Sequence, residues 1–230
     1  SIEDLKRLRP LDPDSDTPYV LETIQLLVEE LAVPLIGFAG APFTLASYLI
    51  EGAPSRTYTK TKALMMNDPE LWDSLMSRLV EIVISSLRSQ ISAGVSAIQL
   101  FDSWAGALSP SAYERFVLPY TKEIFSSIQN EEVPTVHFGV GTGEILHLMA
   151  SAGSSVMGVD WRTPLDVARD RLGSEVALQG NLDPAICFAS ENAISTEVRN
   201  ILEKNAGHPG HIFNLGHGVL PETDPKVLER

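Results

Sequence analysis

The stretch "LAVPLIGFAGAPFTLASYLI" at residues 31–50 decides the fold, because no charged residue interrupts it between Glu30 and Glu51. An uncharged run of this length is about what a helix needs to cross a bilayer. Two prolines and two glycines interrupt its first half, however: Pro34, Gly37, Gly40 and Pro42. Helical periodicity begins only after them. We therefore interpret the stretch as the interior of a soluble domain rather than as a membrane span.

The stretch divides into three pieces. "VPLIGF" at residues 33–38 is a short apolar run, typical of a strand whose two faces are both buried in a parallel sheet. "AGAP" at residues 39–42 is a turn. "FTLASYLIEG" at residues 43–52 indicates a helix, with proline near its first turn and Gly52 just past its end. A strand, a loop and a helix follow one another.

The composition is that of an ordinary globular protein. The 230 residues are 44% hydrophobic, enough for one large α/β domain or two small ones. The 30 acidic residues outnumber the 17 basic ones, giving a net charge of −13, and this argues against nucleic-acid binding. The single cysteine, Cys187, excludes an internal disulfide and a multi-cysteine zinc site. We interpret it as a buried core residue.

The first ten residues, "SIEDLKRLRP", are charged and lack the apolar segment of a signal peptide. With the cysteine content, they lead us to expect a cytoplasmic protein, or a plastid protein if the source is a photosynthetic eukaryote.

Short apolar runs rich in β-branched residues recur along the chain. They are "VPLIGF" (33–38), "SAIQLF" (96–101), "PTVHFG" (134–139), "SVMGVD" (155–160), "EVALQG" (175–180) and "HIFNLG" (211–216). Helical patterns lie between them, near residues 43–52, 69–93, 111–129, 143–152, 164–172 and 191–205. The clearest of these helices has Asp68 as its N-cap and Pro69 in its first turn, and it ends at Gly94. Alternating strands and helices predict a parallel sheet, either doubly wound or closed into a (β/α) barrel.

The segments that follow the strands favour the barrel. They are "AGAP", "DSWAG", "VGTG", "DWRTP", "NLDP" and "HGVLP". Chemistry-bearing residues after every strand suit a barrel, where all these ends meet in one ring, better than a doubly wound sheet with one crevice. We therefore predict a single (β/α)8 TIM-barrel domain over residues 1–230, with about six of the eight βα units present.

The glycine-rich "FGVGTG" at residues 138–143 invites a nucleotide-binding interpretation. The motif lacks the GxGxxG spacing, and no lysine follows to complete a Walker loop. We interpret it as a tight turn.

Residues 37–52, "GFAGAPFTLASYLIEG", together with four later motifs, resemble the uroporphyrinogen decarboxylase family in order and spacing. The later motifs are "QLFDSWAG" (99–106), "GVDWR" (158–162), "LQGNLDP" (178–184) and "FNLGHGVLPETDP" (213–225). The resemblance implies a (β/α)8 barrel, a homodimer and a carboxy-lyase without metal or cofactor. Its implied reaction converts the four acetate side chains of uroporphyrinogen to methyl groups, giving coproporphyrinogen. The implied pathway is that of haem and chlorophyll.

The resemblance also implies the site. The family's substrate-contacting tyrosine, serine and histidine fall on Tyr48, Ser103 and His217, which we expect to be catalytic and to bind substrate, with Phe101 and Asp102 lining the wall. Each of the first three has a plain structural alternative: a surface helix residue, a helix cap and a loop histidine. In a barrel, however, their positions after separate strands would make them converge. For Asp160 and Asn181, turn-forming roles suffice.

The implied chemistry needs an electron sink but no cofactor, because protonation of the pyrrole lets the ring itself accept the electrons. The protein must supply a carboxylate for the pyrrole N–H groups, cations for the substrate's carboxylates, and a dry pocket. Among the basic residues after the strands, Arg162 is best placed to meet a substrate carboxylate.

The chain departs from the family pattern at both ends. The family's arginine-rich motif and its pyrrole-binding aspartate have no counterparts here, and the last barrel helix is incomplete. We expect the missing units to precede Ser1, and residues 1–230 alone to be inactive. One alternative is a non-catalytic barrel that binds porphyrinogens or pairs with a partner subunit. Another, a cobalamin-linked methyltransferase, is disfavoured because it needs a His-x-Cys zinc pair, whereas His137 is followed two residues later by Gly139.

Overall fold

The computed structural model describes residues 2–53 and 55–229. Its sheet contains β1 (Ile36–Gly40), β2 (Ala97–Phe101), β3 (Thr135–Phe138), β4 (Val156–Gly158), β5 (Ala177–Gln179) and β6 (His211–Ile212). The α-helices are α1 (Ile2–Leu5), α2 (Pro13–Asp16), α3 (Pro18–Glu30), α4 (Pro42–Glu51), α5 (Thr59–Asn67), α6 (Pro69–Ser92), α7 (Pro110–Phe116), α8 (Leu118–Ile128), α9 (Leu146–Ala150), α10 (Leu165–Leu172), α11 (Glu191–Lys204) and α12 (Pro225–Leu228). The 3-10 turns are η1 (Ala105–Ala107), η2 (Gln129–Glu131), η3 (Gly143–Ile145) and η4 (Pro184–Phe188).

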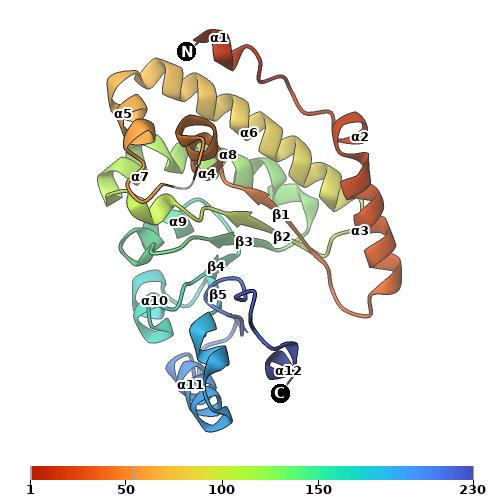
Figure 1. Ribbon diagram of the computed structural model, residues 1–230, viewed down its shortest axis with the longest axis vertical. Helices are drawn as coiled ribbons and strands as arrows, with labels where there is room; N and C mark the ends of the chain where they lie inside the picture. Colours follow the sequence, from red (N-terminus) through yellow and green to blue (C-terminus); the bar gives the residue numbers. More distant parts are fainter. Residues whose placement is uncertain (1, 54, 230) are drawn as a thin grey trace.

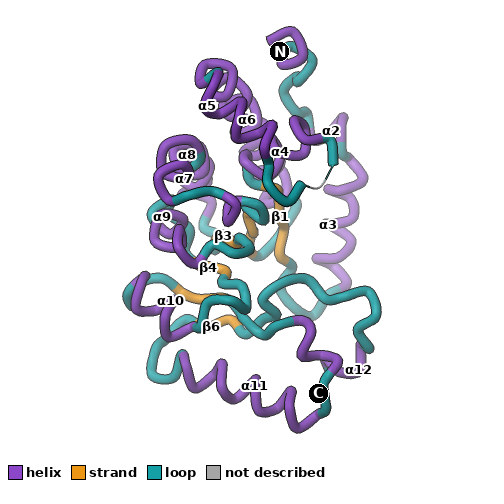
Figure 2. Tube along the Cα trace, turned by 60° about the vertical axis from the view of Figure 1, so that its left-hand side comes forward, coloured by secondary structure: helices purple, strands orange, loops and turns teal. Residues whose placement is uncertain are grey.

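The strand order confirms the α/β class and the parallel sheet. Every strand pairs in parallel with the next strand of the chain, in the order β1-β2-β3-β4-β5-β6 (Figure 1). Helices α8, α9 and α10 follow one another beside the strands in the same order (Figure 2). A doubly wound sheet would reverse its strand order at a switch point, whereas a (β/α) barrel does not. The sheet has the order of a barrel, and within the described ladders no pairing joins β6 to β1.

The opening stretch folds as expected. Residues 36–40 form β1 and residues 42–51 form α4, which ends at Gly52 in the left-handed region with φ +75°. The strand begins three residues later than the apolar run, and it includes Ala39 and Gly40, which the sequence had assigned to the turn. Within the described residues, no helix combines the length and the apolar character that a membrane span requires.

The predicted helix at residues 111–129 is wrong in one respect, because the structure breaks it at Val117 into α7 and α8. Pro119 explains the break: proline has no N–H to donate, and its ring clashes with the carbonyl four residues earlier in a continuous helix. It is tolerated in the first turn of α8, where N–H groups have no helical partner. The sequence analysis also missed α3 and α5.

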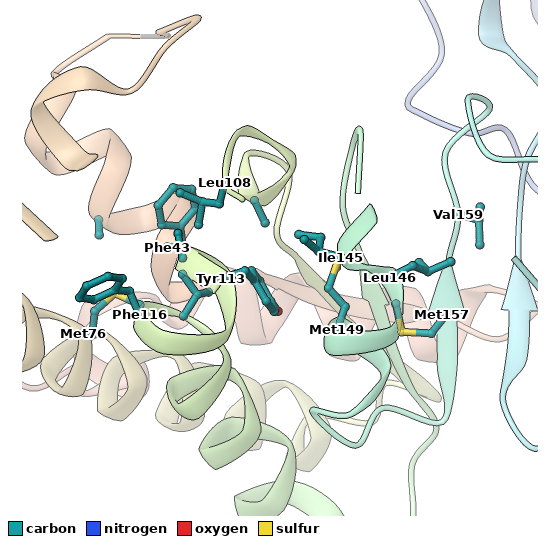
Figure 3. Close-up of a cluster of buried hydrophobic side chains, with 14 of the residues drawn as sticks. Phe43, Met76, Leu108, Tyr113, Phe116, Ile145, Leu146, Met149, Met157 and Val159 are labelled. Carbon is teal, nitrogen blue, oxygen red and sulfur yellow. The ribbon is translucent and has the colours of Figure 1, made fainter. Parts of the chain in front are cut away.

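The helices pack on the sheet through two clusters of buried apolar side chains. The first includes Phe43, Trp72, Tyr113, Phe116 and Leu146, part of which Figure 3 shows. The second centres on residues of α6, β2 and α8: Val80, Val83, Leu87, Ile98, Leu100, Ile124 and Phe125. Burying each large apolar side chain stabilises the fold by about 1.5–3 kcal/mol. Cys187 is buried as well, as the sequence indicated.

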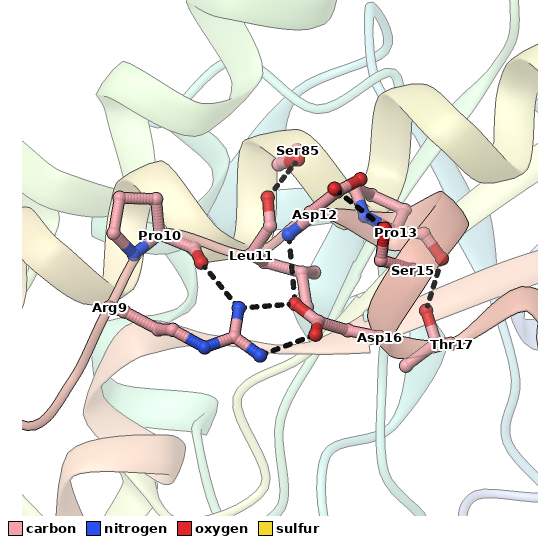
Figure 4. Close-up of polar contacts among 9 residues, drawn as sticks. All are labelled: Arg9, Pro10, Leu11, Asp12, Pro13, Ser15, Asp16, Thr17 and Ser85. Carbon is pink, nitrogen blue, oxygen red and sulfur yellow. Dashed lines mark hydrogen bonds and ion pairs between the residues drawn. The ribbon is translucent and has the colours of Figure 1, made fainter.

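The N-terminal segment lies along α6. The Arg9 guanidinium forms a bidentate ion pair with Asp16, and the Ser85 hydroxyl on α6 donates to the Leu11 carbonyl at 3.2 Å (Figure 4). The Arg9 hydrogen bonds, with a further one from the Asp12 amide, lower the pKa of Asp16 from 3.8 to about 2. The Ser85–Leu11 hydrogen bond joins this segment to α6, whereas the Arg9–Asp16 pair lies within the segment.

Candidate active site at the carboxyl ends of the strands

A cavity of about 340 Å³ opens on the inner face of the sheet. Its lining comes from β1, β2, β3, β5 and the segment after β6: Ile36, Phe38, Gln99, Phe101, Phe138, Gln179, Asn214, Leu215, His217, Gly218 and Val219. Its size lies near the lower end of the range of about 300–1,000 Å³ that is usual for small-molecule sites. Two of the residues predicted from the sequence, Phe101 and His217, meet here.

Aromatic rings form one wall of this cavity. Phe101 and Phe138 are register partners on β2 and β3, and their ring centroids lie 5.9 Å apart. Phe38 on β1 lies 5.8 Å from Phe101 in an edge-to-face arrangement. The His217 ring continues the row, 6.5 Å from Phe138. Such edge-to-face contacts favour a fixed apolar surface, and an apolar wall strengthens any electrostatic contact made beside it.

Two buried amides supply the polar part of the lining. Gln99 on β2 and Gln179 on β5 reach across the inner face, and Gln179 Nε2 donates to Gln99 Oε1 at 3.1 Å. This bond uses one donor and one acceptor, and each amide has further hydrogen-bonding capacity. The pair therefore offers donors and acceptors to a ligand within an otherwise apolar cavity.

A cation is connected to His217 through one aromatic ring, that of Trp161. The Trp161 ring is 6.2 Å from the His217 ring, and the Arg162 guanidinium lies over Trp161 at 3.9 Å. Arg162 Nη1 also donates to the buried Asp160 carboxylate at 2.8 Å. The side chain of Arg162 is nevertheless 52% exposed, so its remaining N–H groups can meet an anion.

Asp160 and Asn181 hold the loops of this end together. The Gly141 amide donates to Asp160 Oδ2 at 2.6 Å, and Gly141 has φ +68°. The Asn181 amide donates to the carbonyls of Asp160 and Thr163 at 2.8 and 2.6 Å. Asp160 also accepts from the Arg162 amide in its own turn, as expected, whereas Asn181 joins its loop to the one after β4. The tight turn expected for the glycine-rich segment is confirmed at Gly141.

The structure places Tyr48 and Ser103 outside the lining of the 340 Å³ cavity. Tyr48, near the end of α4, is 53% exposed, and its ring lies 4.1 Å from that of Trp104. Ser103, which follows Asp102 in the sequence, is half-buried. Both residues lie beyond the carboxyl ends of β1 and β2. Their roles in binding and catalysis stay predictions.

The sequence analysis missed Phe38, Gln99, Phe138 and Gln179 as cavity residues. A signal was present, because Gln99 and Phe101 are two positions apart and so share one face of β2. A glutamine inside each of two apolar runs, "SAIQLF" and "EVALQG", marks a strand face that is not wholly apolar.

Comparison with known proteins gives a consistent result. The family model described as uroporphyrinogen decarboxylase (URO-D) matches residues 1–230. The uroporphyrinogen decarboxylase of Salinispora tropica is 61% identical over 228 residues, covering 99% of this chain and 61% of that protein. The one from Streptomyces coelicolor is 58% identical, covering 99% of this chain and 64% of that protein. The chain thus spans about three fifths of the length of these relatives.

Two solved structures share the fold at low sequence identity. A putative vitamin-B12 independent methionine synthase from Listeria monocytogenes superimposes with a TM-score of 0.58 at 12% identity, covering 88% of this chain and 64% of that chain. A B12-independent methionine synthase from Shewanella sp. W3-18-1 gives a TM-score of 0.60 at 13% identity, covering 90% and 62%. At these identities the likeness concerns the fold alone.

Proposed function

We propose, since this chain belongs to the uroporphyrinogen decarboxylase family, that the protein is a carboxy-lyase of tetrapyrrole biosynthesis. It converts the four acetate side chains of uroporphyrinogen to methyl groups and releases coproporphyrinogen. The observation that carries the proposal is the meeting of Phe101 and His217 in one cavity at the inner face of the sheet.

The cavity suits a decarboxylation in which the pyrrole is the electron sink. A proton added to a pyrrole carbon lets the ring accept the electron pair that the departing CO₂ leaves behind. A second proton then completes the new methyl group, and loss of the first restores the pyrrole. The rings of Phe101 and Phe138 keep water from one side of the bound ring, so that charges at the mouth act through a medium of low polarity.

His217 and Arg162 have separate tasks in this scheme. His217 lies in the cavity lining and is exposed, so its imidazole can hold or move a proton at the substrate. Arg162 lies beyond Trp161, and its guanidinium binds a substrate carboxylate. Tyr48 and Ser103 contact the part of the tetrapyrrole that extends past the cavity, over the ends of β1 and β2. The buried amides of Gln99 and Gln179 meet the polar edge of the bound ring.

The test is an anaerobic assay of the complete gene product with uroporphyrinogen, in which the products are separated by their number of carboxyl groups. We expect stepwise conversion to coproporphyrinogen, and a loss of turnover in Phe101→Ala and His217→Asn. Tight binding of the porphyrinogen without any loss of carboxyl groups would support the non-catalytic alternative. No binding and no turnover would refute the proposal.

We propose further that residues 1–230 alone are inactive. Two inner-face side chains of β1 are open to solvent, Ile36 at 47% and Phe38 at 63%, so one side of the cavity has no wall. An apolar edge strand of this kind also favours association with another chain. The assay is repeated on residues 1–230, and activity comparable to that of the complete gene product would contradict this proposal.

The family resemblance also supports a homodimer, which light scattering of the purified protein would test.

We propose a cytoplasmic location. Its support is the single cysteine, which suits a reducing compartment. Fractionation of the source cells would test this location.

A further inference from the structure

Two buried side chains behind the candidate site have facing polar atoms without partners. Asp102, directly after β2, and His137 on β3 are both fully buried. Asp102 Oδ2 and His137 Nε2 lie 3.7 Å apart, and neither atom has a hydrogen-bond partner at ordinary distance. A buried polar group without a partner costs about 1–3 kcal/mol, so this arrangement requires an explanation.

The hydrogen-bonding capacity of the ring supplies that explanation. His137 Nδ1 lies 3.3 Å from the Met149 carbonyl oxygen, which can only accept. On the other side, Nε2 faces the Asp102 carboxylate, which also only accepts when ionised. A neutral imidazole carries a single N–H. In either neutral tautomer, one ring nitrogen would therefore turn its lone pair toward an acceptor.

We propose that both ring nitrogens of His137 carry a proton, that the ring forms a buried ion pair with Asp102, and that this pair positions Ser103 and Tyr48. The doubly protonated ring donates from Nδ1 to the Met149 carbonyl and turns its second N–H toward the Asp102 carboxylate, which balances its charge. The positioning of Ser103 and Tyr48 for catalysis rests on the proposed function, whereas the protonation state of His137 does not.

Asp102 joins the elements that carry the predicted site residues. Its N–H donates to the Phe138 carbonyl on β3 at 2.7 Å, and its Oδ1 accepts from the Thr44 hydroxyl on α4 at 3.3 Å. Thr44 lies one helical turn before Tyr48, and Ser103 is the residue after Asp102. Fixing Asp102 therefore fixes Ser103 and the helix of Tyr48 relative to the aromatic wall.

The surroundings of the pair favour an internal balance of charge. From α7 the Tyr113 hydroxyl is buried, and burial, with the negative charge of Asp102, raises the pKa of Tyr113 well above its usual value. The phenol therefore stays neutral. From α8 the Phe125 ring lies 5.4 Å from the His137 ring. From α4, within the described part of the chain, only the Thr44 hydroxyl hydrogen-bonds to the carboxylate.

The protonation state is measured by NMR on the complete gene product labelled with ¹⁵N-histidine, with the His137 signals identified by their loss in His137→Gln. In the folded protein we expect N–H resonances from both ring nitrogens of His137. In Asp102→Asn the amide donates to Nε2, so the ring should become neutral and keep one N–H. A single N–H in the unmodified protein, as a bridging water would give, overturns the ion pair.

The positioning role is measured by steady-state kinetics. Asp102→Ala should lower kcat by tenfold or more while KM changes less than threefold, because Asp102 lies outside the cavity lining. Asp102→Asn, which keeps the bond to Thr44 and a polar group facing His137, should restore kcat to within about threefold of the unmodified protein. Asp183→Ala is the matched control, since Asp183 also follows a strand but caps only its own turn η4. Its kcat should change less than twofold.

The outcomes separate the two proposals. Two ring N–H signals in the unmodified protein, together with an unchanged kcat in Asp102→Ala, would support the ion pair but overturn its positioning role. A kcat loss in Asp102→Asn equal to that in Asp102→Ala would also overturn that role. Absence of any decarboxylation by the unmodified protein would refute the proposed function, and with it the positioning of a catalytic site, while the NMR result would still decide the ion pair.

Discussion

Gly106 offers a sharp test of how the loops at the carboxyl end of the sheet fit together. It lies in the turn η1 after β2, and the backbone of residues 140–141 passes directly over its Cα. A Cβ at position 106 would lie 2.2 Å from the Val140 carbonyl oxygen and 2.6 Å from that of Gly141. Both contacts are with backbone, so no side-chain rotation can relieve them.

The size of the effect follows from these distances. An ordinary contact between a Cβ and a carbonyl oxygen is about 3.4 Å, so Gly106→Ala must push two loops apart by about 1 Å. Overpacking of this kind costs about 1–3 kcal/mol, and we expect the upper end because the obstacle is main chain. For a domain of this size each kcal/mol lowers Tm by about 2–4 °C, so about 3 kcal/mol lowers it by about 6–12 °C.

The assay is thermal and urea unfolding of the complete gene product and of two variants. Gly218→Ala is the control, because no atom of residues 2–53 and 55–229, its two chain neighbours aside, lies within 4 Å of the position that its Cβ would occupy. We expect the control to unfold within about 0.5 kcal/mol of the unmodified protein. If Gly106→Ala unfolded at the same midpoint as the control, the close contact between η1 and the glycine-rich turn would be wrong.

Three further predictions follow from the site and the N-terminal segment. His217→Asn should lower kcat while leaving the unfolding midpoint nearly unchanged, because the ring is exposed on a loop; a large loss of stability with normal turnover would contradict its catalytic role. Arg162→Met should raise KM about fivefold, a factor equivalent to about 1 kcal/mol, as expected for a half-exposed cation; an unchanged KM would remove Arg162 from carboxylate binding. Asp16 should titrate near pH 2 by NMR, since Arg9 lowers its pKa to about 2. Because the folded pKa is the lower one, its contribution to stability is present above about pH 4 and is lost as the pH falls toward 2; a midpoint near 3.8 in the unmodified protein would contradict the ion pair with Arg9.

The sequence predicted the alternation of strands and helices well because its signals are local. Each signal determines the structure at its own position. The apolar runs form strands, Asp68 and Pro69 begin α6, and the left-handed Gly52 ends α4. The missed break at Val117 was local too, and Pro119 was its visible cause. The bounds of β1, which begins at Ile36 and extends to Gly40, differ from the predicted ones because pairing with β2 sets them, and local sequence does not.

The site was predicted only in part. His217 was found through the family resemblance and Phe101 as a neighbour of Ser103 in the same loop, and the cavity brings the two together. The contact between Asp102 and His137 could not be read from the sequence, because it depends on the pairing of β2 with β3 and on side-chain geometry across 35 positions. The sequence likewise gave no sign that Tyr48 would pack against Trp104.

The most direct test of the central claim is a crystal structure of the complete gene product with coproporphyrinogen bound. We predict that the tetrapyrrole lies against the rings of Phe101 and Phe138, with His217 within hydrogen-bonding distance of it. The chain has another apolar cavity, of about 380 Å³, between η4, α11 and α12, lined by Cys187, Val198 and Phe213 among others. A product bound there, with the cavity at Phe101 empty, would contradict the assignment of the site.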